Sequence, residues 1–166
     1  MAHRTGRLYG GTARGAGAPV GSLPGAFGAV LLTGLLTGCA GTVQVEPAGE
    51  GASTACRDVV DRLPGSLSDQ PRRGAEGAGV AAWGDPAIVL RCGTEPLGPT
   101  TRECVTVDGM DWVVLAQGED GAAVFATYGR VPGVEVEVPG AYAPAPGVLP
   151  GLGPAVSELP VERSCL

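Results

Sequence analysis

The sequence lacks lysine and has a single histidine, His3, close to its N-terminus. It is also poor in aromatic residues, with two Trp, three Tyr and two Phe in 166 residues, so a core must consist mainly of Val, Leu, Ile and Ala. In contrast, 29 Gly and 15 Pro make up about a quarter of the chain. This composition predicts many turns and few long helices. The length suits one domain, or one domain with a targeting segment.

The N-terminal region has the zones of a secretory signal. Arg4, Arg7 and Arg14 supply positive charge, and residues 15–38 carry no charge. Residues 26–36 (AFGAVLLTGLL) are an apolar stretch of 11 residues, shorter than the ~20 residues that a membrane-spanning helix requires. We therefore expect residues 1–38 to be a signal peptide that is removed.

The segment Leu36-Thr37-Gly38-Cys39 combines an aliphatic residue, two small residues and a cysteine. It resembles the lipobox of bacterial lipoproteins. The resemblance implies that Cys39 receives a diacylglyceryl group and that the chain is cleaved before it. Burial of each CH2 of an acyl chain such as palmitate contributes about 0.8 kcal/mol, and two chains anchor a protein stably. We therefore expect a lipid-anchored protein on the extracytoplasmic face of the cell membrane. The alternatives are an ordinary cysteine within a signal, or an uncleaved anchor.

The chain from Cys39 to Leu166 contains neither His nor Lys. This absence excludes Ser-His-Asp and Cys-His catalytic arrangements, lysine Schiff bases and imidazole-containing metal sites. The same 128 residues keep eight Arg against all 17 acidic residues, which gives a net charge of −9. Nucleic-acid binding requires clustered positive charge, so we expect no nucleic-acid partner. We also expect no metal, no cofactor and no enzymatic activity.

Four cysteines remain once Cys39 is lipidated: Cys56, Cys92, Cys104 and Cys165. An even number in an oxidising compartment predicts two structural disulfides. None of the four belongs to a C-x-x-C pair, which argues against a zinc ribbon or a thioredoxin-like motif. Spacing alone leaves all three possible connectivities open.

The sequence pattern predicts a single domain over residues 54–166, preceded by a flexible tether over residues 39–53 with a reach of about 20 Å. Residues 54–63 have apolar positions with helical spacing and follow Ser53, a candidate N-cap. Residues 66–79 are predicted to be a polar loop. The pattern then changes to short strands, and a short helix over residues 152–159 is expected near the C-terminus.

Two strand signals are particularly clear. Asp108-Gly109 separates two β-prone segments and predicts a tight hairpin. Residues 134–138 (VEVEV) alternate strictly, so their Val side chains are expected to face the core and their Glu side chains the solvent. The expected fold class is α+β: an antiparallel meander of about five strands, covered on one face by an N-terminal helix and a short C-terminal helix.

Several motifs resemble an actinobacterial lipoprotein family known as domain of unknown function 3515. They are the helix that ends in Leu63-Pro64, the run 82–93 (AWGDPAIVLRCG), the segment 107–112 (VDGMDW) and the segment 134–139 (VEVEVP). The resemblance spans residues 55–160 and implies that Cys56 pairs with Cys92. Cys104 and Cys165 are then expected to form the second bridge. Strand alternation places the Cys104 side chain on the opposite face of the sheet from the Val105 and Val107 side chains. The C-terminal tail, which carries Cys165, is therefore expected to cross the less apolar side of the sheet.

A candidate binding site consists of Trp83, Asp85, Arg91 and Trp112. Charged groups beside an aromatic ring could bind a ligand, but a turn at Asp85-Pro86 and a core position for Trp83 explain the same residues structurally.

The pair Arg72-Arg73 is either a contact for an anionic envelope polymer or lipid headgroup, or simply part of a solvated loop. Asp108 and Asp111 suggest a hairpin turn more than a calcium site.

The sequence thus favours a non-catalytic lipoprotein that binds or scaffolds an unidentified protein or glycan at the cell envelope. Two alternatives remain open. One is an envelope enzyme with Asp85 or Asp111 as general base and Arg91 holding an anionic group. The other is a redox protein that uses Cys104 and Cys165.

Overall fold

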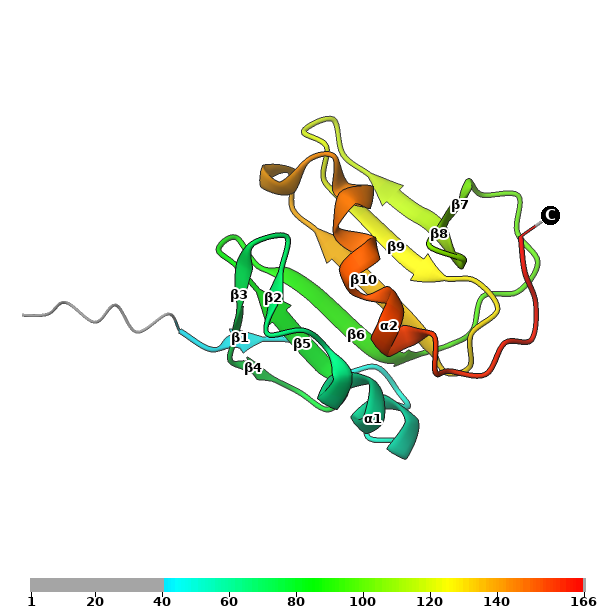
Figure 1. Ribbon diagram of the computed structural model, residues 1–166, viewed down its shortest axis with the longest axis horizontal. Helices are drawn as coiled ribbons and strands as arrows, with labels where there is room; N and C mark the ends of the chain where they lie inside the picture. The colour runs from blue at the N-terminus through cyan, green and yellow to red at the C-terminus, as the bar shows by residue number, and fades with distance from the viewer. Residues whose placement is uncertain (1–40, 166) are drawn as a thin grey trace, which may run out of the picture. The chain divides into compact units, whose positions relative to one another are not determined.

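The computed structural model describes residues 41–165 of the chain. An eight-stranded sheet has the order β2-β3-β5-β6-β10-β9-β8-β7, and all neighbouring strands are antiparallel (Figure 1). Its strands are β2 (Ser66–Leu67), β3 (Gln70–Arg73), β5 (Val80–Trp83), β6 (Ile88–Thr94), β7 (Cys104–Val107), β8 (Met110–Gln117), β9 (Ala123–Thr127) and β10 (Gly133–Val138). A separate two-stranded parallel pair consists of β1 (Val43–Gln44) and β4 (Ala75–Glu76).

The sheet is built from two meanders that meet in its middle. Strands β2, β3, β5 and β6 follow one another in chain order, and residues 95–103 then lead the chain to the far edge of the sheet. From there β7, β8, β9 and β10 return in chain order until β10 pairs with β6. The prediction of an antiparallel sheet is therefore correct, but the strands form two meanders rather than one, and the expected count of about five strands is too low.

The missing strands lie mainly in residues 66–79, which were predicted to be a polar loop. Strands β2 and β4 have two residues each, and β3 consists of Gln70-Pro71-Arg72-Arg73. Segments this short and polar show no alternation that sequence analysis could detect. Their pairing with β5 and β1 supplies the backbone hydrogen bonds that hold them in place.

The first helix, α1 (Thr54–Arg62), lies within one residue of the predicted range. The Ser53 hydroxyl accepts a hydrogen bond from the Cys56 backbone N–H at 3.2 Å, so it caps the helix as expected. Cys56 and Val59 are buried, and a disulfide joins Cys56 to Cys92 on β6 with the Cα atoms 5.5 Å apart. The first helix is therefore fixed to the middle of the sheet.

The C-terminal helix is shorter than the predicted range 152–159, and a 3-10 segment precedes it. A 3-10 segment, η2 (Ala145–Gly151), precedes the four-residue helix α2 (Gly153–Val156). Pro150 lies inside η2 and Pro154 inside α2, and proline cannot donate a backbone hydrogen bond. In Figure 1, η2 and α2 lie in front of β9 and β10. A further 3-10 turn, η1 (Gly140–Tyr142), follows β10.

The core contains both tryptophans, and each is fully buried. It also contains the inward residues of β6, β9 and β10, which include Ile88, Leu90, Phe125, Val134, Val136 and Val138. Among the Glu residues of β10, Glu137 is exposed and Glu135 is half-buried. The predicted alternation of residues 134–138 is therefore confirmed, with Val inside and Glu on the other face.

The hairpin at Asp108-Gly109 is also confirmed. It joins β7 to β8, and Asp108 and Gly109 have positive φ values of 50° and 77°. A turn with two such residues matches the right-handed twist of the flanking strands.

The segment predicted to be a flexible tether is attached to the domain over most of its described length. Val43 N–H donates to Gly74 O at 2.8 Å, and Glu50 N–H donates to Gly93 O at 3.0 Å. Small residues such as Gly51 favour this attachment because they allow two backbones to approach closely. The boundary expected at residue 53 is therefore wrong, since the domain already includes residues 43–53.

The C-terminal tail is also attached to the sheet. Arg130 and Val161 form an antiparallel bridge, and Glu162 N–H donates to Gly129 O at 2.7 Å. A second disulfide joins Cys104 on β7 to Cys165, with the Cα atoms 6.5 Å apart. Among residues 41–165, no helix has the length and apolarity needed to cross a membrane. The predicted signal peptide and Cys39 lie outside the described residues.

Candidate functional site

The two tryptophans of the candidate binding site are core residues. Trp83 and Trp112 are both 0 % exposed, and the Trp83 indole N–H donates to Pro64 O at 2.9 Å. A side chain with no exposed surface cannot present an aromatic face to a ligand. The structural explanation of Trp83 is therefore correct, and neither tryptophan belongs to a surface site.

Asp85 and Arg91, the charged members of that candidate site, lie in separate environments. Asp85 follows β5 in an exposed turn, where its carboxylate lies 3.6 Å from the Arg73 guanidinium. Arg91 lies between the buried residues Leu90 and Cys92, so it points to the other face of the sheet and pairs with Glu135 on β10. The structure thus does not bring the four predicted residues together.

The pair Arg72-Arg73 stabilises the fold. The Arg72 guanidinium lies 5.9 Å from the Trp83 ring centroid and donates to Val60 O and Leu63 O at the end of α1. Arg73 donates to Gly84 O and, at 2.9 Å, to Gly41 O. Both side chains are therefore bound to the backbone, and neither belongs to a solvated loop.

Asp111 connects the C-terminal tail to the sheet. Its carboxylate accepts hydrogen bonds from the Thr106 hydroxyl at 2.6 Å and from Cys165 N–H at 2.9 Å. Asp108 occupies the hairpin turn, as expected. Asp85 and Asp111 therefore contact different partners, and the structure does not bring these two carboxylates together.

Arg130 holds the end of α2 close to the loop between β9 and β10. Its Nη1 donates to Ser157 O at 2.8 Å and to Leu159 O at 2.6 Å. Burial lowers the pKa of Arg130, and the nearby Asp111 carboxylate opposes that shift. This arginine therefore connects the helix, the tail and β8.

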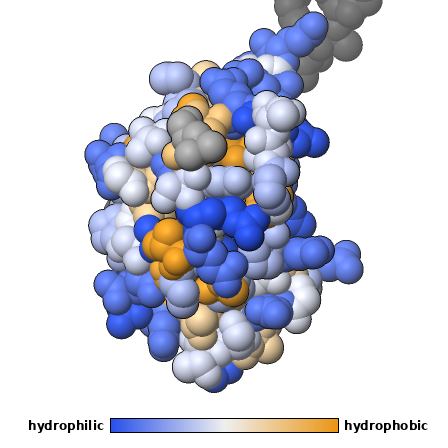
Figure 2. Space-filling view, turned by 90° about the vertical axis from the view of Figure 1, so that its right-hand side faces the viewer, coloured by the Kyte–Doolittle hydropathy of each residue, from blue (hydrophilic) through white to orange (hydrophobic). Residues whose placement is uncertain are grey.

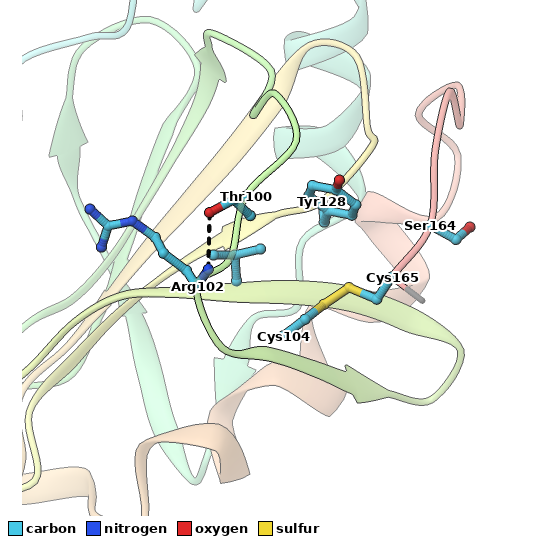
Figure 3. Close-up of a pocket in the computed structure, with 7 residues that line it drawn as sticks. Thr100, Arg102, Cys104, Tyr128, Ser164 and Cys165 are labelled. Carbon is cyan, nitrogen blue, oxygen red and sulfur yellow. Dashed lines mark hydrogen bonds between the residues drawn. A yellow bond between two sulfur atoms is a disulfide. The ribbon is translucent and has the colours of Figure 1, made fainter.

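The candidate site that the structure itself provides is a groove of about 320 Å³ beside the Cys104–Cys165 disulfide. Cys104 pairs with Val113, so the groove lies on the face of the sheet opposite Trp112. The tail therefore crosses this face, as the alternation around Cys104 predicted. Residues from three separate segments line the groove, among them the hydroxyl-bearing Thr100, Tyr128 and Ser164 (Figure 3).

The chemistry of this groove is polar. In Figure 3 the Tyr128 ring lies above the disulfide, whereas the Arg102 side chain extends away from it. Arg102 Nη1 donates to Leu115 O at 2.7 Å. Figure 2 shows the side of the molecule that lies at the right of Figure 1, where hydrophobic residues form small patches among hydrophilic ones. Sequence analysis missed the residues that line this groove because they are distant in the chain.

Cys104, Asp111 and Cys165 place two sulfur atoms and one carboxylate oxygen within 4.8 Å of one another. However, both sulfurs are bonded to each other, and a disulfide offers no thiolate to a metal. In this state the cluster does not have the donor set of a metal centre.

The structure contains the Cys56–Cys92 disulfide that the family resemblance implied, and the Cys104–Cys165 disulfide that was expected for the two remaining cysteines. Comparison with curated proteins and with solved structures gives no match. Comparison with family profiles matches residues 29–163 to the family described as "Protein of unknown function (DUF3515)". That range covers most of the chain, and the chain therefore belongs to the DUF3515 family.

Proposed function

We propose that this protein is an extracytoplasmic lipoprotein, anchored in the cell membrane through Cys39, whose domain binds or scaffolds another component of the cell envelope. The observation that carries the proposal is Leu36-Thr37-Gly38-Cys39, which begins at the last residue of the apolar stretch 26–36 and comes after an arginine-containing segment. Two acyl chains on Cys39 would be sufficient for stable anchoring.

The two disulfides support an extracytoplasmic location. Disulfides persist in oxidising compartments and are rare in the cytosol. The cysteine that takes part in neither bridge is Cys39, which is the residue that the lipid would modify.

The groove beside Cys104–Cys165 is our candidate for the contact with an envelope protein or glycan. Its lining includes the hydroxyl-bearing residues Thr100, Tyr128 and Ser164, whose side chains are exposed or half-buried. Such groups bind partners by hydrogen bonding rather than by acid–base chemistry, and the chain after Cys39 has no His or Lys to supply such chemistry. This combination supports a binding role in preference to a catalytic one.

A thiol–disulfide function of Cys104 and Cys165 is a second candidate. Both residues are half-buried next to the groove, whereas Cys56 and Cys92 are fully buried. Thiol–disulfide exchange requires access of an attacking thiolate to a sulfur atom, so only the outer bridge meets this requirement in the folded domain.

Substitution of Cys39 tests the anchor. We expect Cys39→Ala to abolish incorporation of radiolabelled palmitate and to move the protein from the membrane fraction to the soluble fraction. Cys104→Ala is the matched control, because it also removes one cysteine but leaves Cys39 intact and should not prevent lipid incorporation. Membrane retention of Cys39→Ala would contradict the proposal.

A photo-crosslinking residue tests the groove. Placed at Thr100, it should give a specific adduct in living cells, whereas the same residue at Asp61 on the exposed side of α1 should not. Identical adducts from both positions would remove the groove as the contact site.

A further inference from the structure

We infer that the surface formed by β1 and β4 faces the lipid headgroups at a separation of about 1 nm or less, and that the Cys104–Cys165 groove faces away from the membrane. This inference rests on the proposed lipid anchor at Cys39. It adds an orientation: which side of the domain lies against the leaflet and which side a partner can reach.

Gly41, two residues after Cys39 in the sequence, is already bound to the domain. Gly41 O accepts a hydrogen bond from Arg73 Nη2 at 2.9 Å, and Val43 N–H donates to Gly74 O at 2.8 Å. Val43 and Gln44 then pair in parallel with Ala75 and Glu76. These contacts fix the start of the domain at the β1–β4 pair.

Very little chain separates this fixed point from the anchor. Only Ala40 lies between Cys39 and Gly41. Because an extended chain spans at most about 3.6 Å per residue, the Cα atoms of Cys39 and Gly41 lie within about 7 Å of each other. A flexible tether over residues 40–53 would have allowed a reach of about 20 Å and free rotation of the domain. The observed attachment removes nearly all of that freedom.

The charge of the β1–β4 surface indicates whether electrostatic attraction or the lipid anchor holds it at the membrane. Glu46 and Glu76 are exposed next to the strand pair, whereas the Arg73 side chain is only 15 % exposed. An acidic surface is not attracted to anionic headgroups. The lipid anchor, and not electrostatic adhesion, must therefore hold the β1–β4 surface at the membrane.

The groove lies at the other end of the domain. In Figure 1 the longest axis is horizontal, with β1 and β4 at the left of the sheet and the tail that carries Cys165 at the right. An anchor at the β1–β4 end therefore leaves the groove accessible from the side away from the membrane. A soluble or wall-attached partner could reach it without penetrating the lipid.

Energy transfer to labelled lipid tests this orientation. The lipidated full-length protein is placed in vesicles of phosphatidylethanolamine and phosphatidylglycerol that contain a rhodamine-labelled lipid. A donor dye is attached through a non-canonical amino acid at Glu46, near the anchor, or at Thr100, beside the groove; both positions are exposed. We expect more energy transfer from position 46 than from position 100.

An insertion variant is the control. Twenty Gly and Ser residues between Ala40 and Gly41 add a reach of about 25 Å, so the difference between the two positions should be lost. Should a dye at Glu46 disturb the fold, Glu76 is the second position near the anchor. Equal transfer from both positions in the original protein would overturn the orientation.

The proposed function and this inference fail in different ways. Unmodified Cys39→Ala protein that still binds the vesicles would contradict the lipid anchor itself, and with it the orientation. Lipidated protein that binds, but transfers energy equally from both positions, would overturn only the orientation.

Discussion

Gly93 at the end of β6 lies directly against the backbone of Gly51, in the segment that leads into α1. A Cβ atom on Gly93 would collide with the Gly51 nitrogen and the Glu50 carbonyl carbon, and Gly93 has a φ of 98°. The hydrogen bond from Glu50 N–H to Gly93 O lies at the same point. This contact attaches residues 48–53 to the sheet and thereby fixes the start of the first helix.

Gly93→Ala should therefore be strongly destabilising. Overpacking of a filled site costs roughly 1–3 kcal/mol, and a side chain in the left-handed region adds about 1–2 kcal/mol. We expect the free energy of unfolding to fall by about 3 kcal/mol, as measured by urea denaturation. Gly109→Ala is the matched control: Gly109 has a similar φ of 77° but no atom within 4 Å of a new Cβ, so only the backbone cost of about 1 kcal/mol applies. Equal losses in both variants would show that the Gly51–Gly93 contact is not tight.

The two disulfides should differ in their resistance to reduction. Cys56 and Cys92 are 0 % exposed, whereas Cys104 and Cys165 are half-buried. In native protein treated with a mild dithiol reductant, we expect alkylation of Cys104 and Cys165 first, and of Cys56 and Cys92 only after unfolding. Peptide mass mapping of the alkylated cysteines provides the measurement.

Reduction of the outer bridge should also lower stability. It joins positions 61 residues apart, and the chain-entropy estimate for a loop of that length is about 4 kcal/mol. If both bridges resist reduction equally in the folded protein, the thiol–disulfide function of Cys104 and Cys165 loses its support.

Arg72 should contribute to stability through its fixed geometry. Its guanidinium donates to Val60 O at 3.1 Å and Leu63 O at 3.4 Å, and it lies over the Trp83 ring. Arg72→Ala should lower the free energy of unfolding by about 2 kcal/mol, because two carbonyls at the end of α1 lose a charged donor. Arg72→Lys should restore little of this loss, since an ammonium group does not have the planar fork of a guanidinium.

Arg62→Ala is the control for this measurement in thermal or urea unfolding. Arg62 is exposed and makes a single long contact of 3.5 Å with Asp58 O. Its removal should change stability by less than about 0.5 kcal/mol. A loss of that small size for Arg72→Ala would contradict the structural role of Arg72.

Three local features could be predicted from the sequence because neighbouring residues determine them. The apolar spacing after Ser53 defined α1, Asp108-Gly109 defined the β7–β8 hairpin, and the Val–Glu alternation defined the faces of β10. In each case the pattern and the structure lie within one short continuous segment of the chain. The required hydrogen bonds and side-chain directions follow from the backbone period alone.

The candidate binding site could not be predicted in this way. Trp83, Asp85 and Arg91 are close in sequence, yet they lie in three different places. Trp83 is buried in the core, Asp85 lies in a turn at one end of the sheet, and strand alternation directs Arg91 to the other face of the sheet. The groove shows the reverse relationship, because Thr100, Tyr128 and Ser164 are far apart in sequence and line the same space.

By itself, the sequence determined the candidate anchor at Cys39, the absence of His and Lys from residue 39 onward, and the local helix, hairpin and strand. Only the tertiary structure decided that residues 43–53 are bound to the domain and that β10 pairs with β6. The physical reason is the range of the interactions. Local periodicity is set by adjacent residues, whereas strand order and close glycine contacts depend on which distant segments bury their backbone groups together.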